Sequence, residues 1–141
     1  MRLESSYPFA VTLARLRSGL EARGFRIFAV IDHRGAAQSV DLVMPPSTVL
    51  IYGDPRSGTP LMLSAPDFAL ELPLRLLVRE GKHGKTYVTY NPAATLEGKH
   101  GLAAGMAQKL TPVEGIIASA LIASSANNRR MQSSQNVDGS F

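Results

Sequence analysis

The chain has 141 residues, which is enough for one domain and too few for two independent hydrophobic cores. It contains no cysteine, which excludes disulfides, thiolate metal sites and cysteine nucleophiles. The net charge of +4 permits a nucleic-acid partner, but the arginines are scattered without aromatic residues between them, so the sequence does not favour nucleic-acid binding.

In the first half of the chain, helical and extended patterns alternate. A single apolar stripe predicts an amphipathic helix over residues 8–23, with Gly24 as a left-handed residue just past its end. The short run FRIFAVI at 25–31, rich in β-branched and aromatic residues, predicts a buried strand, followed by one or two helical turns. After Pro45 and Pro46, residues 47–52 predict a second strand.

The second half begins with the turn GDPRSG, after which Thr59 and Pro60 predict the start of a short helix that Pro66 interrupts. Residues 74–80 and 85–91 flank a Gly-bounded loop and predict a β-hairpin. The TPVE capping box at Thr111 predicts a last helix that packs on the sheet.

These elements predict an α+β fold, a two-layer sandwich in which a mixed or antiparallel sheet of four to five strands carries helices mainly on one face. We expect a single domain over residues 1–124 and a disordered polar tail over residues 125–141. No signal peptide is apparent at the N-terminus, and the apolar stretch at 115–126 is shorter than the roughly 20 residues that span a bilayer. The expected location is therefore the cytoplasm, with no membrane partner.

Four ordered motifs, IDHRGAA, YGDP, LPLRLLV and VTYNP, resemble those of the domain-of-unknown-function family 302 over roughly residues 3–123. The resemblance implies a small α+β domain of bacterial or archaeal origin, often a stand-alone domain, without an established activity. The second motif reads Tyr52-Gly53-Asp54-Pro55 here, where Phe-Gly-Asn-Pro is typical of the family. The extra negative charge at Asp54 disfavours an anionic ligand at that turn.

Polar residues gather where two predicted strands end, at 32–34 and 52–56, and predict a small-molecule pocket at these strand ends. The candidate ligand-binding residues are Asp32, His33, Arg34, Tyr52, Gly53, Asp54, Arg56, Tyr90 and His100. A simpler interpretation of Asp32 is that it caps the following helix. Likewise, GDPRSGT lacks the lysine of a phosphate-binding P-loop and is typical of an ordinary turn before a capped helix.

Two other functions stay open. His33 could act as an acid–base group with Asp32 or Tyr90 in an enzyme of unknown reaction. The chain could also be a homodimeric interaction module, because the hairpin strands are apolar on both faces and only two long helices are predicted to cover them, unless the 60–70 segment covers the second face. The histidines and carboxylates lack metal-ligand spacing, so we predict neither a metal nor a cofactor.

Overall fold

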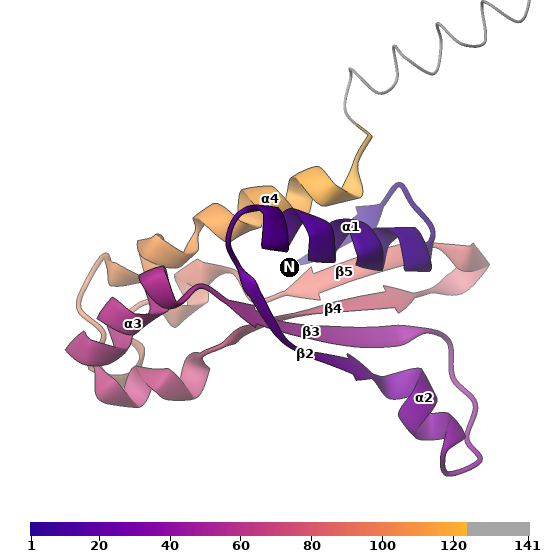
Figure 1. Ribbon diagram of the computed structural model, residues 1–141, viewed down its shortest axis with the longest axis horizontal. Helices are drawn as coiled ribbons and strands as arrows, with labels where there is room; N and C mark the ends of the chain where they lie inside the picture. Colours follow the sequence, from indigo (N-terminus) through magenta and orange to yellow (C-terminus); the bar gives the residue numbers. More distant parts are fainter. Residues whose placement is uncertain (124–141) are drawn as a thin grey trace, which may run out of the picture.

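The computed structural model describes residues 1–123, so the last residue of the predicted domain and the predicted tail lie outside the described residues. A five-stranded sheet in the order β1-β5-β4-β3-β2 forms the centre of the fold, and all its neighbours pair antiparallel (Figure 1). The strands are β1 (Arg2–Ser5), β2 (Arg26–Asp32), β3 (Ser47–Gly53), β4 (Leu74–Glu80) and β5 (Thr86–Tyr90). The predicted α+β fold is confirmed.

Two helices, α1 (Phe9–Ala22) and α4 (Pro112–Leu121), lie side by side on one face of the sheet (Figure 1). Helix α1 turns its predicted stripe toward the strands, and α4 adds Val113, Ile117 and Leu121. Alternate residues of the central strands complete this main core, as expected for strands with one covered face. The predicted position of the helices, mainly on one face, is therefore also confirmed.

A second, smaller core lies beyond one end of the sheet, where α3 (Pro55–Ser64) and several 3-10 helices gather. The 3-10 helices span Pro66–Glu71, Ala93–Leu96, Lys99–Gly101 and Met106–Leu110. The buried side chains of this core are Leu61, Ala65, Phe68, Ala93, Leu96, Leu102, Ala107 and Leu110. We call this region the α3 lobe, and because the 60–70 segment belongs to it, that segment does not cover the second sheet face.

The opposite end of the sheet carries a different structure, which we call the arm and define as residues 33–46. It consists of α2 (His33–Gln38) and the segment that leads back to β3, and it projects away from the sheet (Figure 1). None of its side chains is buried. The arm therefore adds no residue to either core.

Several local predictions need correction. Helix α3 begins at Pro55, behind Asp54, so Thr59 does not cap it and Pro60 lies within it. The Thr111 hydroxyl donates to the Gln108 carbonyl at 2.6 Å, so the predicted capping box of α4 is wrong although the helix itself forms.

Gly24 has the predicted left-handed backbone, with φ of 85°. No helix among residues 1–123 combines the length and apolar character needed to cross a bilayer.

Candidate functional site

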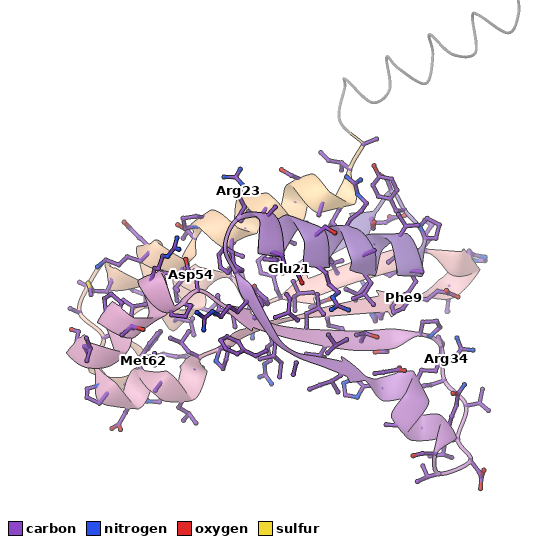
Figure 2. The ribbon with its side chains drawn as sticks, in the orientation of Figure 1. Phe9, Glu21, Arg23, Arg34, Asp54 and Met62 are labelled. Carbon is purple, nitrogen blue, oxygen red and sulfur yellow. The ribbon has the colours of Figure 1, made fainter. Side chains whose placement is uncertain are left out.

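Antiparallel pairing separates the two groups of predicted site residues. Asp32 at the end of β2 pairs with Thr48, whereas Gly53 at the end of β3 pairs with Arg26 at the start of β2. The two strand ends are about six residues apart along the strands, or about 20 Å. The prediction of one pocket formed by 32–34 together with 52–56 is therefore wrong, as the opposite positions of Arg34 and Asp54 show (Figure 2).

Asp32, His33 and Arg34 lie at the base of the arm and are exposed. The Asp32 carboxylate accepts a hydrogen bond from the Gly35 backbone N–H at 3.0 Å, so Asp32 caps α2. A side chain at position 35 would start 2.7 Å from this carboxylate, which explains the glycine. Tyr90 ends β5, which β4 and β3 separate from β2, so Tyr90 does not pair with His33 in the way the acid–base hypothesis required.

The other six predicted residues lie at the end of the sheet that carries the α3 lobe. The Asp54 carboxylate accepts from the Arg56 backbone N–H at 3.0 Å and caps α3, while the Arg56 side chain is exposed. His100 Nε2 lies 3.0 Å from Glu71 Oε1. This hydrogen bond is the main cause that lowers the pKa of the Glu71 carboxyl, with help from Lys99 at 3.9 Å.

Tyr52 and Tyr90 face the helices and, with Glu114, line a cavity of about 20 Å³, which is room for about one water molecule. Burial raises the pKa of the Tyr52 phenol, and the Tyr90 and Glu114 charges raise it further. Burial and then Glu114 also raise the pKa of Tyr90. Both phenols are therefore neutral near pH 7, and the Tyr90 hydroxyl donates to Met1 Sδ at 3.1 Å.

A much larger depression of about 1450 Å³, which we call the groove, runs along the helix pair and down toward α3. Small side chains of α1 and α4 form its upper part, and Gly53, Asp54 and Met62 border it near α3. Figure 2 shows Asp54 and Met62 at this end of the molecule. The groove therefore includes three residues of the predicted 52–56 group, Gly53, Asp54 and Pro55, and none of the 32–34 group.

The charged side chains that line the groove are mostly cationic. They are Arg15, Arg23 and Lys109, and the one carboxylate among the lining residues is that of Asp54. Arg15 is held in place, because its Nε donates to the Ala120 carbonyl at 2.8 Å and its guanidinium lies 4.3 Å from the centre of the Tyr7 ring. Because three cationic side chains outnumber the single Asp54 carboxylate, which caps α3, the charges of the groove favour an anionic group.

The helical walls of the groove were not predicted from the sequence, because only the apolar stripe of the first helix and the packing of the last helix on the sheet were considered. A usable signal was present, because small residues recur every four positions on α1 and also on α4. They are Ala10, Ala14, Ser18 and Ala22 on α1, and Gly115 and Ser119 on α4. Among residues 1–123, no group of three or more histidine or acidic side chains is arranged to hold a metal ion.

Comparison with known proteins places these features in context. The profile of the family described as "Domain of unknown function DUF302" matches residues 1–120. The chain is 34% identical over 100 residues to the protein named fluoride-specific ion channel FluC 1 of Brucella suis biovar 1 (strain 1330), and equally so to FluC 1 of Brucella abortus biovar 1 (strain 9-941). The match covers 71% of this chain but only 39% and 37% of those proteins, so the chain spans less than two-fifths of their length.

A solved structure shares the fold. It is the crystal structure of an uncharacterised conserved DUF302 protein from Bacillus stearothermophilus, with a TM-score of 0.71 and 19% identity. The similarity covers 86% of this chain and 94% of that one.

Proposed function

We propose that this chain, which belongs to the DUF302 family of domains of unknown function, is a small-molecule-binding domain. Its ligand is an amphipathic molecule with an anionic group. The ligand occupies the groove between the helix pair and α3. This proposal keeps the ligand-binding function inferred from the sequence and moves its site to one end of the sheet. The observation that carries it is the groove itself, with its apolar walls and cationic side chains.

The size of the groove supports an organic ligand. Ligand pockets commonly measure roughly 300–1,000 Å³ and are lined mainly by apolar groups with a few polar ones. The groove exceeds this range at about 1450 Å³, so a ligand of ordinary size fills one part of it. In the part near α3, Gly58 is buried, and a side chain at that position would start 3.4 Å from Leu72 Cδ1.

The charges of the groove support an anionic group on the ligand. Arg23 and Lys109 are exposed lining residues, and neither forms a salt bridge with a described residue. The Asp54 carboxylate accepts its backbone hydrogen bond inside α3. An anion near the two cations gains attraction from both, whereas a cation would have only Asp54.

Fluoride, which appears in the names of the Brucella relatives, is a less suitable ligand for this groove. A single small ion leaves nearly all of the 1450 Å³ unfilled and gains nothing from apolar walls. We therefore propose that the domain binds an organic molecule, and fluoride serves as a comparison ligand in the test.

Two fluorescent probes test the proposal because they differ mainly in charge: 8-anilinonaphthalene-1-sulfonate is anionic and N-phenyl-1-naphthylamine is neutral. We expect Ala14→Trp, which fills the upper groove, to weaken both probes at least tenfold. The double variant Arg23→Glu with Lys109→Glu weakens the anionic probe about tenfold, which corresponds to about 1.4 kcal/mol, and leaves the neutral probe nearly unchanged.

The matched control is Arg34→Glu, which reverses the charge of another exposed arginine, at the other end of the molecule, and should change neither affinity. Anionic-probe binding that is unaltered in Ala14→Trp would place the ligand outside the groove and end the proposal. Competition of fluoride with the anionic probe at millimolar concentration would instead favour an ion site.

A further inference from the structure

The face of the sheet opposite α1 and α4 is uncovered by any helix among residues 1–123 (Figure 1). Strand register identifies the side chains on this open face, because directly paired residues point to the same side. Its apolar centre is formed by Val49, Ile51 and Leu77 of β3 and β4, and Ile31 of the edge strand β2 extends it. The charged and aromatic side chains on this face are those of Arg2, Glu4, Arg26, Arg75, Arg79 and Tyr87.

The arm has the composition of a buried segment, although the chain itself does not bury it. Val40, Leu42 and Val43 are 65%, 63% and 96% exposed, and α2 has only six residues. A helix this short is marginal without tertiary packing. Contiguous exposed apolar side chains on a projecting segment are typical of a protein interface.

We propose that two copies of this chain form a two-fold dimer in which the arm of each copy packs on the open sheet face of the other. The apolar tip of one arm covers the apolar centre of the partner's face. This arrangement is self-complementary, as a two-fold interface requires, because every copy supplies one arm and one face. Five strands about 4.8 Å apart and at most about 24 Å long give a sheet face of about 450 Å². A stable interface buries roughly 800 Å² on each partner. The face alone is therefore too small, and the surface of the arm has to be buried as well.

Charge complementarity supports a second copy as the occupant. The open face has four arginines against Glu4, so three of the chain's four net positive charges lie on it. The arm presents Asp41 between Val40 and Leu42 at its apolar tip, while its one arginine, Arg34, lies at its base. Direct stacking of two basic faces is repulsive, whereas an arm with a carboxylate at its tip meets the arginines of the partner's face.

Sedimentation equilibrium of the full chain at 5–100 µM tests the dimer, with concentrations chosen around the affinity of an ordinary transient interface, roughly micromolar. We expect a mass of twice 15.1 kDa for the parent and at least a tenfold weaker association for Val43→Asp on the arm and Ile31→Asp on the open face. The control is Leu70→Asp, since Leu70 is 80% exposed in the α3 lobe and its replacement should leave the dimer intact. Far-UV circular dichroism verifies that each variant is folded.

A parent mass of 15.1 kDa up to 100 µM overturns the proposal, and so does a dimer that Val43→Asp and Ile31→Asp leave unchanged. A monomeric parent that binds an oligothymidylate 20-mer through Arg75 and Arg79 would assign the basic face to a polyanion instead. High salt offers a further check, because a dimer that depends on Asp41 and the face arginines should weaken as salt screens them.

Discussion

The two ends of the sheet differ in how the chain packs around them. At one end, the α3 lobe encloses its own core with Phe68 fully buried, and it borders both the groove and the cavity below Tyr52. At the other end, the arm buries no side chain and holds three large exposed apolar residues within four positions. The two segments that follow β2 and β3 thus begin alike, with an aspartate cap, and end in opposite environments.

This difference indicates where each end finds its stabilisation. The α3 lobe buries eight apolar side chains in its own core and leaves Leu63 and Leu70 exposed at its surface. Part of its surface borders the groove. The arm buries none of its apolar side chains, and packing them against a partner would be favourable. In the two proposals above, one end binds a small molecule and the other end packs against a second copy of the chain.

The largest expected effect compares one buried residue with one exposed residue. Phe68→Ala should lower the free energy of unfolding by about 3–5 kcal/mol, because it removes a fully buried ring and leaves a cavity in the α3 lobe. Val43→Ala on the arm should change it by less than about 0.5 kcal/mol when measured on the monomer at low concentration. Urea denaturation followed by circular dichroism measures both, and equal losses would erase the distinction between the two ends.

Periodicity in the sequence was sufficient to predict the main layer of the fold. The stripe on α1, the hairpin of β4 and β5 and the helix α4 all follow from side chains that repeat with the helical or the strand period. Strand β1 has only four residues, with no alternation long enough to identify it. The 3-10 helices between 93 and 110 lack a period of their own and are held by tertiary packing in the α3 lobe.

The site was only partly predictable for a specific geometric reason. Placing 32–34 beside 52–56 assumed that consecutive strands end at the same edge, which holds for parallel strands. The arm instead reverses the chain, so β2 and β3 are antiparallel and their ends are apart. By contrast, the interpretation of Asp32 as a helix cap needed only local chemistry, and the structure confirms it.

The two caps offer a second, smaller test of the comparison. Asp54→Ala should cost about 1 kcal/mol of global stability, because α3 packs through Leu61 into the second core. Asp32→Ala removes an equivalent cap but should change global stability by less than about 0.5 kcal/mol, since α2 contributes no buried side chain. Thermal melts at one fixed low protein concentration measure both.

Asparagine caps helices about as well as aspartate, so Asp54→Asn and Asp32→Asn are the matched controls and should retain stability. A loss in Asp32→Ala that matches the loss in Asp54→Ala would mean that the arm is coupled to the core of its own chain.

The smallest expected effect concerns the hydrogen bond between His100 and Glu71 on the surface of the α3 lobe. The hydrogen bond from His100 is the main cause that lowers the pKa of Glu71 below its usual value of 4.5, and Lys99 adds to it. A carboxyl whose pKa is lower in the folded chain binds fewer protons there than in the unfolded chain, so its contribution to stability is present above pH 4.5 and is lost as acid titrates the folded form. Glu71→Gln should therefore melt slightly below the parent at pH 7, and the difference should close as the pH falls from 5 to 3.

His100→Ala should reproduce the same closing difference, and the double variant should add little to either, because the two side chains act through one contact. A difference in melting temperature that stays constant down to pH 3 would show that the contact does not depend on the Glu71 charge. The contribution of this contact to the stability of the α3 lobe would then not be electrostatic.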